Sequence, residues 1–347
     1  MTTFNPDDPG IANGNYFGLP YNIEEADIVL VPAPWDVTTS YRAGTHQGPE
    51  AIMEASLQVD LYDLLVPEAW ETKIGTLSID SSIEKSNRSA RKHAEKVIAH
   101  LESGGDINEV KDLLTKVNNA SKELNNKIYN YCKEQIAQGR ITGVVGGDHS
   151  VPFGNMLAVS ETTEDFGILH IDAHADLRSA YEGFDYSHAS IMYNALKDIP
   201  QLSQLTQVAI RDFSRREAGL IDSDSRIRCF TDHEIRKNIF EGKTWKQQCE
   251  DIIATLPRDI YISFDIDGLS PELCPNTGTP VPGGLSFREA DYLLYLLAIS
   301  NKRIIGFDLC EVSPAEAGEW DANVGARMLF KLALYTKLNS NKNNNKV

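Results

Sequence analysis

The sequence predicts an α/β protein in which helices cover a parallel β-sheet. Short apolar or β-branched runs recur along the 347 residues, and most are continuously apolar, as in parallel strands that are buried on both faces. Segments with helical periodicity separate these runs, and this alternation is typical of a parallel sheet. The predicted strands are Ile28–Val31, Lys73–Leu77, Thr142–Val145, Phe166–Ile171, Gln207–Ile210, Ile227–Phe230, Ile260–Phe264 and Arg303–Phe307.

Three segments between these runs carry clear helical features. Gly48–Gln58 has a proline near its first turn, where proline is favoured. Ser286–Ile299 opens on a capping box formed by Ser286 and Glu289. Asp106–Gln138 repeats apolar residues at steps of three and four, so one face of this helix should pack against the rest of the protein.

We expect a single domain over residues 1–336. Within it, residues 1–25 form an N-terminal extension and residues 80–140 form a helical insertion between strands. The Asn- and Lys-rich residues 337–347 are predicted to be disordered. Active sites on parallel sheets lie at the carboxyl ends of the strands, so we expect the functional residues among those that follow each strand.

Composition narrows the possible partners. The formal net charge of −17 argues against nucleic acid, whose phosphates are neutralised by Lys and Arg, and would favour a cationic substrate. The sequence contains no 18-residue apolar run and begins without a basic-then-apolar leader, so we expect no membrane partner. Its five cysteines lack CxxC spacing, which favours a cytoplasmic protein without a disulfide framework or a thiolate zinc site.

The run His170–Asp176 follows a predicted strand and alternates ligand-type residues with small ones. Side chains two residues apart in an extended chain point to the same face, so Asp172, His174 and Asp176 should converge. Burying such carboxylates without partners would be costly. The run therefore predicts half of a divalent-metal site.

Two other strand ends supply the remaining half of this site. His149 follows two glycines after one strand, and Asp265 and Asp267 follow another. Two imidazoles and four carboxylates are too many for one catalytic zinc, and they suit two ions that share carboxylates and ionise a water molecule. Oxygen-rich coordination without thiolate favours Mn²⁺, with Ni²⁺, Co²⁺ or Fe²⁺ as alternatives.

The motifs GGDHS, DAHADL and SFDIDGLSP, in this order, resemble those of the ureohydrolases, the family of arginase and agmatinase. The resemblance runs from about residue 28 to residue 334. It implies a three-layer α/β/α fold with an eight-stranded parallel sheet, the arginase-like fold. It also implies two Mn²⁺ ions, one held by His149, Asp172, Asp176 and Asp265, the other by Asp172, His174, Asp265 and Asp267.

The same resemblance assigns catalytic roles to two further residues. His188 matches the histidine that shuttles protons to the departing amine, and an imidazole suits that task near neutral pH. Glu311 matches the glutamate that holds the guanidinium, a planar cation that fits a carboxylate. Asp267 could take a proton from the attacking water. The implied reaction is hydrolysis of a guanidino group to urea and an amine.

The substrate's tail is less narrowly defined by the sequence. Arg178 stands where arginases place an asparagine, which disfavours arginine and leaves agmatine as the predicted substrate. The loop Pro34–Arg42 could overhang the metals, and Trp35 and Tyr41 within it could contact the substrate or pack the loop. If they shrink the pocket, a small substrate such as free guanidine would fit. The run Glu319–Arg327 also resembles agmatinase-like proteins that include nickel-dependent guanidine hydrolases. The alternatives to agmatine are therefore guanidine or a guanidino acid, with Ni²⁺ as the alternative metal, and then arginine. Arg178 is predicted to bind the substrate.

Two other classes of protein compete with this reading. Histone-deacetylase-like amidohydrolases hold one zinc with two Asp and one His, and would not need His149, Asp176 and Asp267 together. A non-catalytic homologue would not need His188 and Glu311. The family resemblance further implies a homo-oligomer, a trimer or a hexamer.

Overall fold

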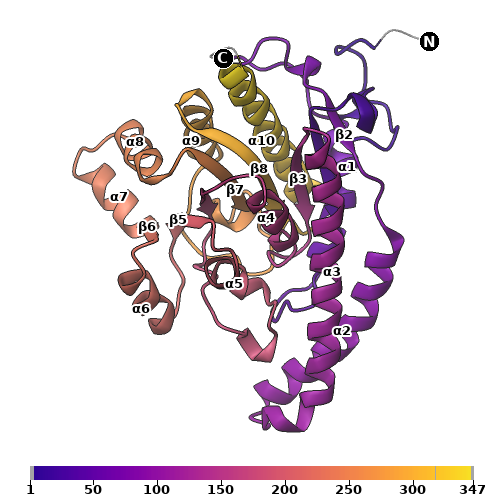
Figure 1. Ribbon diagram of the computed structural model, residues 1–347, viewed down its shortest axis with the longest axis vertical. Coiled ribbons are helices and arrows are strands. Elements are labelled where there is room, and N and C mark those ends of the chain that lie inside the picture. The colour runs from indigo at the N-terminus through magenta and orange to yellow at the C-terminus, as the bar shows by residue number, and fades with distance from the viewer. Residues whose placement is uncertain (1–3, 317, 345–347) are drawn as a thin grey trace.

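The centre of the computed structural model, which describes residues 4–316 and 318–344, is one β-sheet (Figure 1). The described residues place eight strands in it, in the order β2-β1-β3-β8-β7-β4-β5-β6, and every neighbouring pair is parallel. All eight predicted strands are confirmed. Their bounds are β1 Ile28–Ala33, β2 Ile74–Thr76, β3 Ile141–Gly146, β4 Phe166–Ile171, β5 Leu202–Ile210, β6 Ile227–Thr231, β7 Asp259–Asp265 and β8 Arg303–Cys310.

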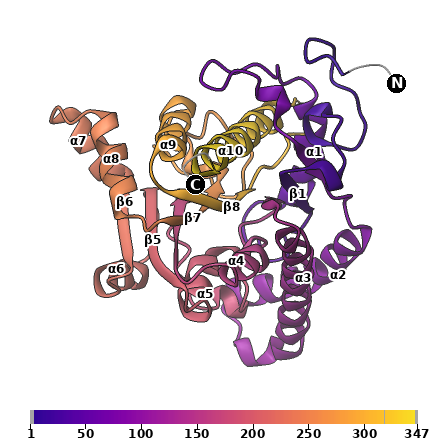
Figure 2. The same ribbon diagram turned by 45° about the horizontal axis from the view of Figure 1, so that its top comes forward.

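Helices cover both faces of the sheet, so the predicted three-layer α/β/α arrangement is confirmed (Figure 2). One layer contains α1 (Gly48–Ser56), α7 (Asp232–Phe240), α8 (Trp245–Thr255), α9 (Phe287–Ile299) and α10 (Trp320–Asn344). The other contains α2 (Ser81–Glu102), α3 (Lys111–Ala137), α4 (Phe153–Ser160), α5 (Ile191–Asp198) and α6 (Arg215–Ser223). Short 3₁₀ turns lie at Tyr16–Gly18, Ile23–Glu25, Thr45–Gln47, Ala69–Glu71, Ile107–Val110, Tyr181–Gly183, His188–Ser190 and Ile266–Gly268.

The continuous apolar runs form strands because both of their faces are buried. All six residues of β1 are buried. Leu30 belongs to the core cluster beneath α1, α9 and α10, whereas its neighbour Val31 belongs to the cluster beneath α2 and α3. Each fully buried side chain of this size contributes about 1.5–3 kcal/mol through removal of apolar surface from water. The strand pattern therefore specifies a sheet that lies between two layers.

The helix boundaries follow the capping chemistry in the sequence. Ser286 Oγ accepts a hydrogen bond from Glu289 N at 3.2 Å, and Glu289 Oε2 accepts one from Ser286 N at 2.8 Å. The predicted capping box of α9 is thus confirmed. The segment predicted as one helix over 106–138 is a 3₁₀ turn at Ile107–Val110 followed by α3.

The prediction of disorder after residue 336 is wrong for residues 337–344, because α10 continues to Asn344. Polar composition suggested a solvated tail, but one polar side chain there is buried. Asn339 Oδ1 accepts Ile304 N at 2.8 Å, and Asn339 Nδ2 donates to two carbonyls at the end of α9 and the start of β8, those of Ala298 and Lys302. These bonds attach the end of α10 to the sheet. Residues 345–347 lie outside the described part of the chain.

Within residues 4–316 and 318–344, no helix has the length and apolar character needed to cross a lipid bilayer. Residues 4–25 pack on the body of the protein through Tyr16, Phe17 and Leu19, which join the core cluster under α10. The carboxyl ends of β3, β4, β7 and β8 are neighbours in the sheet order, and the residues that follow them form the site described next.

Candidate metal centre

His149 is placed by a tight approach between two strand ends. It follows β3 and Gly147, where an added Cβ would lie 2.0 Å from the carbonyl oxygen of Trp35 in the loop after β1. Only glycine fits a backbone that approaches this closely. The next residue strengthens the contact, because Asp148 N donates to Trp35 O at 2.7 Å. His149 is thereby buried at the carboxyl edge of the sheet.

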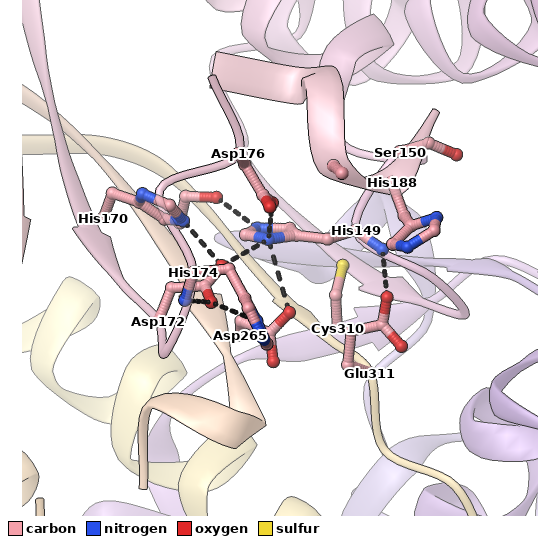
Figure 3. A network of polar contacts seen from close by, with 12 residues as sticks. His149, Ser150, His170, Asp172, His174, Asp176, His188, Asp265, Cys310 and Glu311 are labelled. Atoms are coloured by element: carbon pink, nitrogen blue, oxygen red, sulfur yellow. Dashed lines mark hydrogen bonds and ion pairs between the residues drawn. The ribbon is translucent and has the colours of Figure 1, made fainter. Parts of the chain in front are cut away.

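Three carboxylates surround one nitrogen of His149 (Figure 3). Its Nδ1 atom lies 3.1 Å from Asp172 Oδ2, 3.1 Å from Asp176 Oδ2 and 3.4 Å from Asp265 Oδ2. These four residues come from three strand ends, after β3, β4 and β7. The structure therefore brings together the whole set that the resemblance assigns to the first ion.

A second group forms around His174, on the side facing the cavity. His174 Nδ1 lies 3.4 Å from Asp172 Oδ1 and 3.2 Å from Asp267 Oδ2. Asp172 thus turns one carboxylate oxygen to each histidine, as a bridging carboxylate between two ions would. Asp265 joins this group through the hydrogen bond from Asp267 N to Asp265 Oδ1, at 2.8 Å.

Polar side chains behind the cluster fix its orientation. His149 Nε2 lies 2.9 Å from Ser263 Oγ, and His170 Nε2 lies 2.8 Å from Asp172 Oδ2. His170 in turn meets Gln207 Nε2 through its other nitrogen at 2.9 Å. Sequence reasoning assigned no role to His170, although its spacing of two from Asp172 places both side chains on one face of the chain.

The cluster is electrostatically incomplete without added positive charge. Burial raises the pKa of Asp265 well above its usual value, and Asp267 and Asp172 add to this effect. Burial followed by Asp172 raises the pKa of Asp176 to about 6. Burial also opposes ionisation of Asp172, but the surrounding histidines, His170 foremost, hold its pKa well below the usual range. Asp267 Oδ2 is buried and lies 3.2 Å from His174 Nδ1.

These observations fit a pair of divalent ions. The donor set consists of carboxylate oxygens and imidazole nitrogens without thiolate, which suits Mn²⁺ and tolerates Ni²⁺. The His and Asp side chains form groups that are close enough to hold a metal ion. Positive ions would allow the buried carboxylates to ionise together.

Two residues of the site have a strained backbone. Asp176 has φ +53° and Glu311 has φ +63°, in the left-handed region that non-glycine residues rarely occupy. Asp176 follows β4, and Glu311 is the first residue after β8. Such strain costs about 1–3 kcal/mol per residue and persists where surrounding structure enforces it, most often at functional sites.

Glu311 presents a carboxylate to the cavity beside the cluster. One oxygen, Oε1, accepts a hydrogen bond from His149 N at 3.0 Å. The other, Oε2, is buried without a hydrogen-bond partner. Burial and the neighbouring Asp148 raise the pKa of Glu311 well above its usual value. A bound cation would restore its ionised form.

His188 lies in the wall of the same cavity, between the loop after β1 and the loop after β4. Its Nδ1 atom lies 3.3 Å from Thr38 Oγ1, and its ring packs edge-on against Tyr181. Ser187 caps the short 3₁₀ turn that begins at His188. Burial, then His174 and His149, lower the pKa of His188 to about 4. The imidazole is therefore neutral near pH 7.

Both positively and negatively charged side chains lie at the mouth of the cavity. Arg178 lies over the Tyr181 ring at 4.6 Å, with its Nε 3.5 Å from Glu217 Oε2. Tyr41 is 70% exposed and lines the opening. Asp212 also lines it and was missed by sequence reasoning, since a polar residue after an inner strand looks like an ordinary loop residue.

The predicted substrate contact of Trp35 is wrong. Its side chain is fully buried in the core cluster beneath α2 and α3, away from the residues that line the cavity. The indole ring packs with apolar residues of α2 and α3 in this cluster, while the Trp35 carbonyl accepts the Asp148 amide at the edge of the sheet. Trp35 shapes the site through its backbone.

The fold and the cluster together define a protein with a parallel α/β sheet and a buried His/Asp cluster that could hold metal ions at its carboxyl edge. Comparison with known proteins narrows this class. The family described as the arginase family matches residues 26–335. An N(1)-aminopropylagmatine ureohydrolase from Thermus thermophilus is 32% identical over 321 residues, which cover 90% of this chain and 91% of that protein. The chain belongs to the arginase family and is a ureohydrolase.

Two further proteins are similar to this chain. An agmatinase from Halalkalibacterium halodurans is 29% identical over 295 residues, covering 85% of this chain and 86% of the relative. The crystal structure of an agmatine ureohydrolase from Thermoplasma volcanium superposes with a TM-score of 0.72 at 22% identity, covering 96% of this chain and 97% of that one. At that identity the superposition supports the fold alone.

Proposed function

We propose that this ureohydrolase hydrolyses agmatine to putrescine and urea, with two Mn²⁺ ions held by His149, Asp172, His174, Asp176, Asp265 and Asp267. One observation carries the guanidino specificity: Glu311 Oε2 is buried at the cavity without a hydrogen-bond partner. A planar cation with paired N–H donors would satisfy this oxygen and neutralise the carboxylate. The agmatine tail is supported by the relatives, one of which is named agmatinase.

The cavity favours a substrate that has a tail. Its volume is about 380 Å³, which is within the range of about 300–1,000 Å³ for small-molecule pockets. Free guanidine, with one carbon and three nitrogens, would leave most of this space filled by water. Asp212 at the mouth would attract the terminal ammonium group of agmatine. These features rank agmatine above guanidine.

The proposed mechanism assigns one task to each residue. Metal ions bound by the cluster would supply the positive charge that ionises water at neutral pH and stabilises charge in the transition state. Glu311 holds the guanidinium so that its central carbon faces the attacking oxygen. Asp267 Oδ2 accepts the proton of that water. Addition of water to the carbon and cleavage of its bond to the alkyl nitrogen yield urea.

His188 completes the proton transfer in this scheme. The departing amine needs a proton, and His188 lies in the cavity wall where it can deliver one. Its low pKa keeps the imidazole neutral between turnovers. During the reaction it takes up a proton from solvent and passes it to the departing amine, while Asp267 releases the proton it took from water. The protonated amine and urea together balance the charge of the substrate cation and water.

Arg178 favours a second candidate, a guanidino acid. The guanidinium of Arg178 lies at the cavity mouth, stacked on Tyr181, and it would pair with a substrate carboxylate. A tail such as that of guanidinobutyrate would then be preferred over the cationic tail of agmatine. Arg178 and Asp212 therefore make opposite predictions about the sign of the tail.

Urea release from a substrate panel tests both candidates. The full-length protein would be loaded separately with Mn²⁺ and Ni²⁺ and assayed with agmatine, aminopropylagmatine, guanidinobutyrate, guanidinopropionate, arginine and guanidine. We expect the highest kcat/KM with agmatine and Mn²⁺. A preference for guanidinobutyrate would select the second candidate, and an absence of urea from every compound at full metal content would reject the proposed function.

A further inference from the structure

The helical hairpin formed by α2 and α3 lies beside the active-site loops, and Figure 1 shows these two helices packed along one edge of the molecule. We propose that this hairpin is a brace that positions His188, with Asn87 and Asn118 as its two positioning residues. The inference deepens the proposed function, because it rests on the role of His188 as the proton shuttle. It gives the helical insertion of residues 80–140 a task in the reaction.

On the α3 side, Asn118 holds the loop that leads into His188. Its Nδ2 donates to the carbonyl of Gly183 at 3.2 Å, and its Oδ1 accepts the amide of Asp185 at 3.0 Å. The amide side chain thus replaces the partners that a strand or helix would give this loop. Gly183 has φ +82°, and a Cβ there would lie 2.9 Å from Ile107. The loop and the hairpin therefore fit closely.

On the α2 side, Asn87 holds the loop after β1, which contacts His188 through Thr38. Its Oδ1 accepts the amide of Asp36 at 2.9 Å, and its Nδ2 donates to Asp36 Oδ1 at 3.1 Å. Arg91, one turn further along α2, donates to the carbonyls of Asp36, Val37 and Thr39. In both asparagines, the oxygen and the nitrogen of the side-chain amide each form a hydrogen bond to a loop. Neither is engaged with its own helix.

Thr38 connects the two braced loops at the histidine itself. Its Oγ1 accepts the backbone amide of His188 at 3.1 Å and lies 3.3 Å from His188 Nδ1. This pair of contacts fixes the imidazole orientation and leaves Nε2 as the ring nitrogen available for proton exchange. Displacement of a catalytic group by about 1 Å can reduce the rate about a hundredfold. Bracing both loops therefore bears directly on turnover.

Chemical footprinting tests the brace without relying on activity. In the metal-loaded full-length protein, diethylpyrocarbonate would modify His188, and trypsin would release it in the peptide of residues 179–197, where it is the only histidine. We expect Asn118→Ala to accelerate this modification about fivefold or more, because a loosened loop exposes the ring. The exposed neighbour Asn119 offers the matched control, and Asn119→Ala should modify at the wild-type rate.

Kinetics tests the brace against a merely structural role. We expect Asn118→Ala to lower kcat about tenfold while metal content stays at the wild-type level and KM changes less than about twofold. In a His188→Asn background, the same substitution should have no further effect on kcat, because the braced group is gone. A full additional loss in that background would overturn the inference.

Thr38 supplies a second pair of variants if Asn118→Ala proves unstable. Thr38→Val removes the hydroxyl and should reproduce both effects, whereas Thr38→Ser keeps it and should restore wild-type footprinting and kcat. Unchanged modification rates in both Asn118→Ala and Thr38→Val would overturn the brace. If the wild-type protein releases no urea from any guanidino compound, the proposed function fails, and the footprinting rates still decide on the brace.

Discussion

The two edges of the central sheet differ in whether their buried polar groups have hydrogen-bond partners within the chain. At the amino edge, Asn339 is buried with three hydrogen bonds, and Asp259 at the start of β7 is paired with Arg303 at the start of β8. At the carboxyl edge, Glu311 Oε2 is buried without a hydrogen-bond partner among the described residues, and the buried carboxylates of Asp172, Asp265 and Asp267 lie close to one another. The polar groups named at the amino edge are paired within the chain. Those at the carboxyl edge lack full compensation, and for this reason we expect the function to lie there.

The largest predicted loss of activity comes from a substitution at the carboxyl edge. Asp172→Asn replaces the carboxylate that turns one oxygen to each histidine, and a neutral amide bridges two ions poorly. We expect activity to fall more than about a thousandfold, equivalent to several kcal/mol of transition-state stabilisation. Metal analysis should show loss of bound ions, and EDTA should no longer lower the melting temperature. Full metal content in the variant would contradict the bridging role.

The next substitution lies at the same edge and is expected to impair proton transfer without affecting metal binding. His188→Asn should lower kcat about a hundredfold, within the range of about 10²–10⁴ for general acid–base catalysis. Bound metal should stay at the wild-type level, because His188 is not among the groups around His149 and His174. His233→Asn, on exposed α7, is the matched control. An unchanged pH–rate profile in His188→Asn would exclude the shuttle.

A third substitution tests the amino edge. Asn339→Ala removes the side-chain partner of the Ile304 amide and of the Ala298 carbonyl, at about 1–3 kcal/mol for an unsatisfied group. The Lys302 carbonyl keeps a hydrogen bond from Asn343 Nδ2 at 3.4 Å. A loss of about 2 kcal/mol corresponds to a fall of about 3 °C in Tm for a chain of this size. Kcat should match that of the wild type, and Asn341→Ala, exposed on the same helix, should change neither quantity. A loss of activity without a loss of stability would break the contrast between the edges.

The smallest effect concerns the mouth of the cavity. Arg178 is partly exposed, and exposed ion pairs contribute about 0.2–1 kcal/mol. We expect Arg178→Ala to raise KM for guanidinobutyrate about fivefold at most, and to leave KM for agmatine equal or lower. Arg215→Ala, exposed on α6, serves as the control. Steady-state kinetics with both compounds would show this, and a higher KM for agmatine would contradict repulsion between Arg178 and its tail.

The contrast between edges also explains what the sequence reveals. Ligands after strands are predictable, because alternation and strand order bring Asp172, His149 and Asp265 to one edge. The cavity mouth is harder to predict, because loop residues carry no periodicity. The loop that contains Trp35 was expected to overhang the site, yet the Trp35 ring is buried in the core cluster beneath α2 and α3. Nothing in the sequence separates Asn118 from exposed helical asparagines.

The end of α10 is a second place where the sequence pattern was not enough to predict the structure. Its Asn and Lys content suggested solvation, because composition averages over residues. The buried side chain of Asn339 bonds Ile304 N and two carbonyls, and Lys342 and Asn343 donate to further carbonyls between α9 and β8. These contacts hold the end of the helix against the protein. A specific contact between distant segments outweighs local composition here, and such a contact is visible only once the sheet exists.

The close approach of Gly147 to Trp35 has a consequence for redesign of the substrate pocket. The loop after β1 and the loop after β3 meet backbone to backbone, so they form one mechanical unit. Grafting the loop of residues 34–42 from a relative of different specificity will succeed only if glycine is retained at position 147 or both segments are transplanted together. The shape of the pocket therefore depends on both loops, and they have to be exchanged together.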